Sequence, residues 1–128
     1  MENVKENLYY TKDHDWVRVE GDKAYVGLTN YAQHHLGSIV YAEAPEVDAE
    51  FAKGDAYGVV ESVKAATDVN MPVSGKIVEV NEEVVDAPEK FNEDPWGNWF
   101  VAVEMSDKAE LEELLSAEDY QKLLDEEE

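Results

Sequence analysis

The chain has 128 residues, and its 10 basic side chains against 31 acidic ones give a formal net charge of −21. This charge excludes unassisted binding to nucleic acid or to an anionic membrane, because both need clustered Lys and Arg to neutralise phosphates. The absence of cysteine excludes disulfides, thiolate metal sites and a thiol nucleophile supplied by the chain itself. Hydrophobic residues make up 44%, which is ordinary for a globular domain and predicts one packed core.

The sequence predicts a cytoplasmic location. Its N-terminal segment is polar and mixed in charge, without the apolar region of a signal peptide or the Arg-rich pattern of a transit peptide. No apolar run approaches the roughly 18 residues that span a bilayer. The acidic composition also permits a halophilic protein, a possibility that composition alone leaves open.

The first half of the chain is typical of a β protein with one short helix. Alternating apolar and polar residues predict a β-hairpin over residues 16–28. A short helix follows over residues 30–36, with Thr29 or Asn30 as its N-cap and Gly37 at the position that ends helices.

Further strands are predicted beyond this helix. Residues 81–98 contain turns and short pieces, in which Pro88 fits the first position of a brief helix. Residues 46–56 are loop-like. The predicted strands cover residues 38–44, 57–63, 65–71, 76–80 and 99–103.

The C-terminal part changes to helical spacing. Ser116 followed by Asp119 resembles a capping box, and the last four residues form an acidic run that we expect to be a solvated, frayed end. No Ser/Gly linker precedes this part, so residues 1–128 are predicted to form one domain with a helical extension over about 107–125. Its apolar positions are Leu111, Leu114, Leu115, Tyr120, Leu123 and Leu124.

Lys64 lies midway between two similar elements. Gly54 stands ten residues before it and Gly75 eleven residues after it, and each glycine precedes a predicted strand. A lysine at the tip of a hairpin is displayed, because the turn holds its Cα still while the flexible side chain extends into water. The simpler alternative is a surface lysine in a turn, but lysine is scarce in this acidic chain and the surrounding string is specific.

That string reads Glu61-Ser62-Val63-Lys64-Ala65, and it continues through residues 67–70 and 72–75. It resembles the lipoate-carrying H protein family of the glycine cleavage system, and the resemblance extends over nearly the whole chain. Biotin carriers usually have Met on each side of their lysine. Lipoyl domains of 2-oxo acid dehydrogenases are shorter and usually have an acidic residue before it. The matching positions elsewhere include residues 10–11, 14–16, 27–33, 36–37, 92–95 and 99.

The resemblance implies a fold and a function. The fold is a mainly β barrel-sandwich hybrid, the lipoyl/biotinyl hammerhead, with short peripheral and C-terminal helices. Lipoic acid would be joined in an amide to Lys64. The protein would then be a carrier and not an enzyme. It would take the aminomethyl group of glycine from a pyridoxal-phosphate decarboxylase to a folate-dependent aminomethyltransferase, and reducing equivalents to dihydrolipoyl dehydrogenase.

The resemblance also implies roles for neighbouring residues. Glu61 and Ser62 would help the lipoate-attaching enzyme to recognise the hairpin, although turn chemistry alone also explains a serine there. The loaded arm carries a cationic amine, and carboxylates stabilise a nearby ammonium. We therefore expect arm docking by Asp15 and Asp68, with His14 nearby. Asp13 is a further candidate, and all these acids have the alternative of being ordinary surface charges.

Several positions depart from the family pattern. Asp15 stands where Glu is usual, Ser38 where an acid is usual, and the loop over residues 95–99 looks one residue shorter than in the family. These departures affect the detail of arm docking and partner contact, not the attachment string.

Other functions are weighed against this one. An H-like protein that serves mainly as a lipoyl donor or relay would share Lys64, as would a lipoyl domain of another multienzyme complex. The remaining alternative is an unmodified acidic β-domain. A metal or hydrolytic site is disfavoured, because the adjacent His34 and His35 would point about 100° apart on a helix. We expect no metal, no nucleic acid and no membrane, and a monomer.

The expected core follows from the strand patterns. It comprises Trp16, Val17, Val19, Val26, Leu28, Ile39, Val59, Val63, Val78, Val80, Trp99 and Val101.

Overall fold

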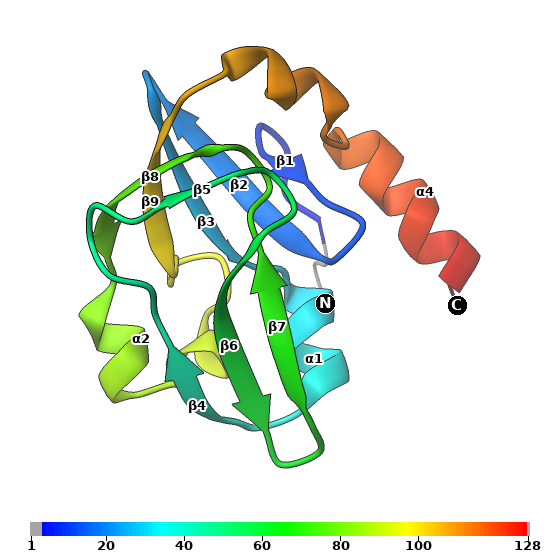
Figure 1. The fold of residues 1–128 in the computed structure, drawn as a ribbon. Helices are drawn as coiled ribbons and strands as arrows, with labels where there is room; N and C mark the ends of the chain where they lie inside the picture. Colours follow the sequence, from blue (N-terminus) through cyan, green and yellow to red (C-terminus); the bar gives the residue numbers. More distant parts are fainter. Residues whose placement is uncertain (1–3, 128) are drawn as a thin grey trace.

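The computed structural model describes residues 4–127, with side chains up to residue 126, and it contains two antiparallel sheets. The larger sheet has the order β1 (Tyr9–Tyr10), β2 (Asp15–Glu20), β3 (Lys23–Leu28), β9 (Val101–Met105), β8 (Gly75–Val80) and β5 (Glu50–Phe51). The smaller sheet has the order β4 (Ile39–Glu43), β6 (Ala56–Ser62) and β7 (Ala66–Asn70). The β6–β7 hairpin projects from the body, with its turn at the bottom of Figure 1.

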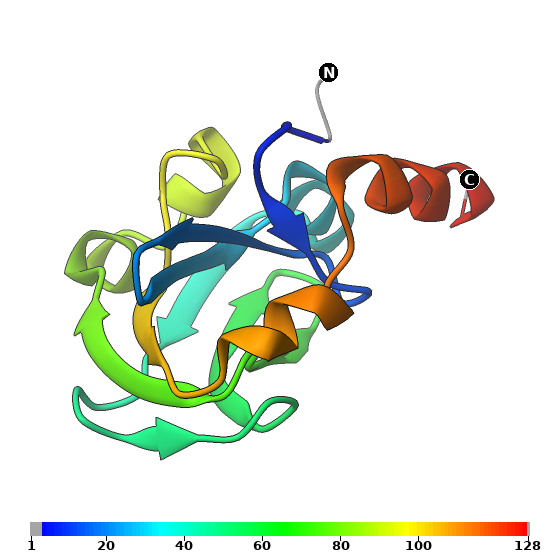
Figure 2. The same cartoon turned by 90° about the horizontal axis from the view of Figure 1, so that it is seen from above.

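Short helices connect and flank the sheets. They are α1 (Asn30–Leu36), α2 (Glu82–Asp86), α3 (Lys90–Glu93), the 3₁₀ helix η1 (Lys108–Glu113) and α4 (Ala117–Glu127). Figures 1 and 2 both place α4 on the same side of the body as α1. Within residues 4–127, no helix is long and apolar enough to cross a membrane.

The predicted helix caps are confirmed. Thr29 accepts a hydrogen bond from the Ala32 amide at the start of α1, and Gly37 ends that helix with φ 83°. The Ser116 hydroxyl likewise accepts from the Asp119 amide before α4. The helix continues to Glu127, so the expected frayed end was wrong for the described part of the acidic run.

Other boundaries differ from the sequence-based expectation. The brief helix α3 begins at Lys90, two residues after Pro88, and β9 runs two residues further along the chain than predicted. The expectation missed β1 and β5 because two-residue strands carry no readable periodicity. It also missed α2, where the Asn81 side chain accepts from the Glu83 amide.

The main core fills the space between the two sheets. Of the predicted core residues, Trp16, Val17, Val26, Leu28, Ile39 and Val101 are buried, whereas Val19, Val59, Val78, Val80 and Trp99 are partly buried. The prediction for Val63 was wrong, because this side chain is 70% exposed. The register of β6 shifts between Ala56 and Gly58, so Val60 faces the core, and Val63 lies three residues further on, beyond the end of the strand at Ser62.

A second cluster attaches α4 to the first strands. Its buried members are Tyr10, Trp16, Tyr120 and Leu124. Residues Tyr10 and Leu115 exchange two backbone hydrogen bonds of 2.8 Å, which tie the segment before α4 to β1. The C-terminal helix is therefore a packed part of the wall around β2.

Candidate functional site

Lys64 occupies the turn of the β6–β7 hairpin and is exposed. The Ser62 amide donates to the Ala65 carbonyl at 2.8 Å and closes the turn. The Ser62 hydroxyl oxygen accepts from the amides of Lys64 and Ala65 at 3.1 and 3.2 Å. A serine two residues before the lysine therefore fixes the backbone locally, and the lysine side chain stays available.

The Lys64 side chain runs across the end of α1. A Cβ placed on Gly37 would lie 3.5 Å from Lys64 Cε and 4.0 Å from Val63 Cγ2. Gly37 directly follows Leu36, which lines a pocket beside the hairpin. Lys64 Cε therefore lies near the C-terminal end of α1, next in the chain to a residue that lines the pocket.

An apolar patch adjoins the lysine. Val63 is 70% exposed, Val40 58% and Tyr41 46%. The Val63 amide donates to the Ser38 carbonyl at 3.0 Å, which places the turn against the start of β4. The β4–β6 register shifts between Ile39 and Tyr41, so two consecutive apolar residues of β4 face solvent. Exposed apolar groups that gather in this way mark surfaces for contact with other proteins.

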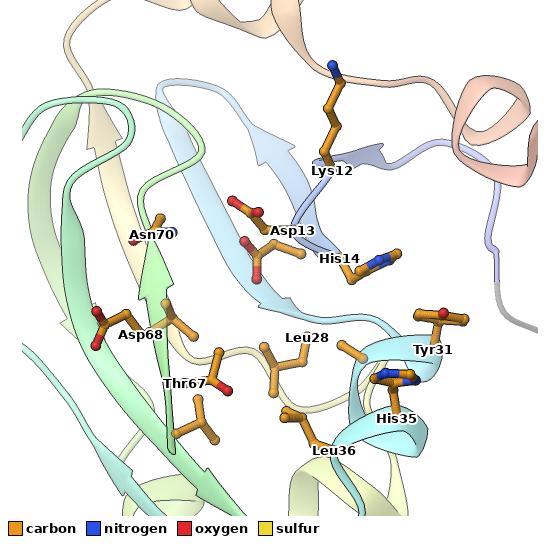
Figure 3. Close-up of a pocket in the computed structure, with 14 residues that line it drawn as sticks. Lys12, Asp13, His14, Leu28, Tyr31, His35, Leu36, Thr67, Asp68 and Asn70 are labelled. Atoms are coloured by element: carbon orange, nitrogen blue, oxygen red, sulfur yellow. The ribbon is translucent and has the colours of Figure 1, made fainter. Parts of the chain in front are cut away.

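The side pocket, as we call it, has a volume of about 510 Å³ and lies between β7, the loop before β2 and helix α1 (Figure 3). The loop supplies its polar end, and the strands and α1 supply most of its apolar walls. Its lining comprises Lys12, Asp13, His14, Asp15, Leu28, Tyr31, Ala32, His35, Leu36, Val60, Thr67, Asp68, Val69 and Asn70.

The structure brings the predicted docking residues to this one pocket. Asp13 and His14 come from the loop before β2, Asp15 is the first residue of β2, and Asp68 borders the pocket from β7. In Figure 3 the Asp68 carboxylate lies on the opposite face of β7 from the Thr67 side chain. Asp68 is therefore a rim residue, whereas the loop residues form the pocket's polar end.

The loop over residues 11–15 is held by the Thr11 side chain. Its hydroxyl oxygen accepts from the amides of Asp13 and Asp15 at 3.2 and 3.1 Å, and the hydroxyl donates to Asp15 Oδ2 at 3.3 Å. His14 adopts φ 68°, in the left-handed region that side chains other than Gly seldom adopt. Its ring Nδ1 lies 2.8 Å from the Tyr120 hydroxyl.

Asp15 is not a surface acid, since only 3% of it is exposed. Burial raises the pKa of its carboxyl to about 8; the negative charge of Asp13 adds to this rise and the Thr11 hydrogen bond opposes it. Burial therefore favours the protonated form of this carboxyl. A cation entering the pocket would favour the carboxylate, and the proton would leave.

Helix α1 supplies a wall that the sequence-based expectation missed. Tyr31 packs between the rings of His14, at a centroid distance of 4.5 Å, and His35, at 5.5 Å. The spacing of Tyr31 and His35, and of Ala32 and Leu36, is four residues, which places each pair on one helix face. This four-residue spacing is the feature of the sequence from which the wall could have been predicted. Within residues 4–127, no group of three or more His, Cys, Asp or Glu side chains could hold a metal ion.

Comparison with known proteins agrees with this geometry. A family model described as glycine cleavage H-protein matches residues 8–127. The chain belongs to this family. It is 61% identical over 124 residues to the glycine cleavage system H protein of Thermoanaerobacter sp. (strain X514), covering 97% of this chain and 98% of that protein. It is 58% identical over 123 residues to the protein of the same name from Clostridium botulinum (strain Loch Maree / Type A3), covering 96% and 95%.

A solved structure shows the same fold. The crystal structure of a glycine cleavage system H protein from Mycobacterium marinum superposes with a TM-score of 0.86 at 34% identity, covering 95% of this chain and 99% of that one. The predicted mainly β fold of the H-protein family is therefore confirmed. Family membership makes the protein a carrier component of the glycine cleavage system, and not an enzyme acting alone or a lipoyl domain of another complex.

Proposed function

We propose that Lys64 carries lipoic acid in amide linkage and that this arm moves the aminomethyl group of glycine between the enzymes of the system. The observation that supports this most directly is an exposed lysine on a fixed turn, whose Cε lies near the end of α1, the helix that forms one wall of a pocket with carboxyls at one end. When bound, lipoic acid supplies the dithiolane sulfurs that a chain without cysteine lacks. The chain's own residues then hold, direct and shelter the arm.

The side pocket suits the loaded end of such an arm. Leu28, Leu36 and Val60 offer apolar contact for a hydrocarbon chain, and the carboxyls of Asp13 and Asp15 stand at the polar end. A cationic amine near Asp15 lowers the pKa of that carboxyl, so the proton leaves and an ion pair forms in a site shielded from water. Asp68 at the rim and His14 beside the loop complete the docking residues of the proposal.

The partners of the proposal are a pyridoxal-phosphate glycine decarboxylase, a folate-dependent aminomethyltransferase and dihydrolipoyl dehydrogenase, which restores the disulfide by thiol–disulfide exchange. A lipoate-attaching enzyme must also reach Lys64. The apolar patch of Val40, Tyr41 and Val63 beside the lysine is suited to contact with these enzymes. Glu61 and Ser62 act in recognition by the attaching enzyme, Ser62 through the turn that it stabilises. A monomeric carrier of one domain in the cytoplasm belongs to the same proposal.

The attachment is tested by intact mass after co-expression with a lipoate ligase. The parent chain is expected to gain one lipoyl group and to support glycine–bicarbonate exchange with a decarboxylase, whereas Lys64→Arg gains none and supports no exchange. Lys23→Arg, in β3 of the other sheet, is the matched control and should behave as the parent. Undiminished exchange by Lys64→Arg would overturn the proposal.

The docking role is tested by the hydrolytic release of the aminomethyl group from the loaded protein. Asp15→Asn combined with Asp68→Asn should speed this release, because the amine loses its carboxylate neighbours. Asp86→Asn combined with Glu104→Gln removes two exposed charges elsewhere and should leave it unchanged. Equal release from both double variants would refute docking by these acids and leave the attachment at Lys64 standing.

A further inference from the structure

Helix α4 contributes none of the described residues that line the side pocket, yet its Tyr120 contacts two of the pocket's walls. The Tyr120 side chain is fully buried, and its ring is stacked on Tyr10 with centroids 4.4 Å apart and planes 2° apart. Its hydroxyl oxygen lies 2.8 Å from His14 Nδ1 and 2.8 Å from Thr29 Oγ1. One atom of the C-terminal helix therefore joins the loop before β2 to the start of α1.

The first of these contacts bears on the loop. The positive φ of His14 persists only because its surroundings hold it. The His14 amide donates to the Thr11 carbonyl at 3.1 Å, and the His14 carbonyl accepts from the Thr29 amide at 3.1 Å. These bonds fix the backbone, whereas the contact with Tyr120 fixes the ring that packs against Tyr31 in the pocket wall.

The second contact bears on α1. Thr29 Oγ1 accepts from the Ala32 amide at 3.1 Å and so begins the helix that supplies Tyr31, Ala32 and Leu36 to the pocket. The Tyr120 hydroxyl carries one proton, so it can donate to one of its two neighbours and accept from the other. A phenylalanine at this position would keep the buried ring and lose both bonds.

We propose that Tyr120 is a positioning residue of the side pocket. Its hydroxyl holds the His14 ring beside the Thr29 side chain that begins α1, and the placement of this ring determines how firmly the pocket holds the loaded arm. The helix can serve as a fixed support, because the Tyr10–Leu115 backbone bonds anchor the segment before it. The inference rests on the proposed function, since it assigns the pocket to an arm carried by Lys64.

The test compares Tyr120→Phe with Tyr10→Phe. Both variants remove a hydroxyl from the same stacked pair, but the Tyr10 hydroxyl bonds to the backbone of Lys5 at 2.6 Å and does not reach the pocket. In the unlipoylated protein, hydrogen exchange of the Thr29 and Ala32 amides should rise about threefold to tenfold in Tyr120→Phe, as expected for a lost hydrogen bond, and less in Tyr10→Phe. Denaturant unfolding of both variants corrects this comparison for changes in global stability.

The same pair is then compared after lipoylation. Release of the aminomethyl group should be about threefold to tenfold faster from Tyr120→Phe, while the rate of lipoate attachment at Lys64 stays that of the parent. Thr29→Val should share the faster release, and Thr29→Ser, which keeps the hydroxyl, should restore the parent's rate.

Three results would overturn the proposal. The first is amide hydrogen exchange in Tyr120→Phe at the rate of the parent. The second is an increase in hydrogen exchange in Tyr10→Phe equal to that in Tyr120→Phe. The third is faster hydrogen exchange at Thr29 and Ala32 without faster release of the aminomethyl group. A failure of the proposed function is distinct, because the parent itself would then gain no lipoyl mass at Lys64.

Discussion

The hairpin turn at Lys64 and the loop over residues 11–15 share one hydrogen-bond pattern but differ in how far they are buried. In each, a hydroxyl oxygen accepts from two amides that follow it, Ser62 in the turn and Thr11 in the loop. Lys64 and Ala65 in the turn are exposed, whereas in the loop His14 contacts α4 and the residue before α1, and Asp15 is buried. An attachment point has to reach several enzymes, and a docking pocket has to keep its shape, so the same local bond serves two different surroundings.

The difference in burial has an energetic side. A carboxyl that is taken out of water is destabilising in its charged form, and burial is the main cause of the raised pKa of Asp15. Hydrogen bonds and packing from the rest of the fold must offset this cost, as they must for a residue with positive φ. The loop thus depends on the whole fold, and the turn depends mainly on residues 62–65 and Ser38.

The largest expected effect is on the buried side of the comparison, in Asp15→Asn. The folded pKa of about 8 lies above the unfolded value of about 3.9, so the folded state keeps a proton that the unfolded state has lost. The free energy of unfolding of the parent therefore falls as pH rises through this window, by at most about 1.4 kcal/mol per pH unit. Between pH 5 and 8 the free energy of unfolding of Asp15→Asn should therefore rise relative to that of the parent by at most about 4 kcal/mol. Urea unfolding at several pH values measures this, with Asp86→Asn as the charge control, and parallel profiles of parent and Asp15→Asn would contradict it.

A matched pair of valines sharpens the contrast within one hairpin. Val60 is 1% exposed and Val63 is 70% exposed, although they lie three residues apart. Val60→Ala should lower the free energy of unfolding by about 1–3 kcal/mol, because it removes buried methyl groups and leaves a cavity. Val63→Ala should change it by less than about 0.5 kcal/mol. Equal decreases in the free energy of unfolding, measured by chemical denaturation, would show that Val63 belongs to the core, as the sequence pattern predicted.

Ser62 tests the turn itself. Ser62→Ala removes the acceptor for the Lys64 and Ala65 amides and should destabilise the protein by about 0.5–1.5 kcal/mol. Attachment of lipoate should slow by about twofold to tenfold, because the displayed lysine loses its fixed turn. Ser62→Asn, whose side chain can accept the same amides, is the control and should recover most of both losses. Attachment by a lipoate ligase is followed by mass, and an unchanged rate for Ser62→Ala would show that the turn forms without this bond.

The sequence predicted the exposed region better than the buried one, for a physical reason. The turn is held by bonds within a few residues, so a short string around Lys64 contains its determinants. The contacts of Tyr120 join residues 106 and 91 positions apart, and no local pattern records them. The helical spacing did place Tyr120 on an apolar face, but the partners of its hydroxyl follow only from the fold.

Asp15 shows the limit of alternation as a guide. A strand with one solvent face would expose a residue next to the buried Trp16, yet Asp15, Trp16 and Val17 are all buried. The strand begins beneath α4 on one side and beside the side pocket on the other, so both of its faces are covered. An aspartate is an unfavourable residue at a strand position that is buried on both faces. Such conflicts between residue type and surroundings concentrate at functional sites.

The smallest expected effect belongs to Glu61, which pairs with Tyr41 in the β4–β6 register beside the apolar patch. Glu61→Gln should leave the free energy of unfolding within about 0.5 kcal/mol of the parent, since it alters a charge on a partly exposed strand end. If the attaching enzyme reads this charge, attachment should slow by about twofold to fivefold, the range of an exposed ion pair. Salt screens such contacts, so the difference should shrink at 1 M salt. Glu79→Gln in β8 is the control, and a slower rate that persists at high salt would point to shape or hydrogen bonding at Glu61 in place of charge.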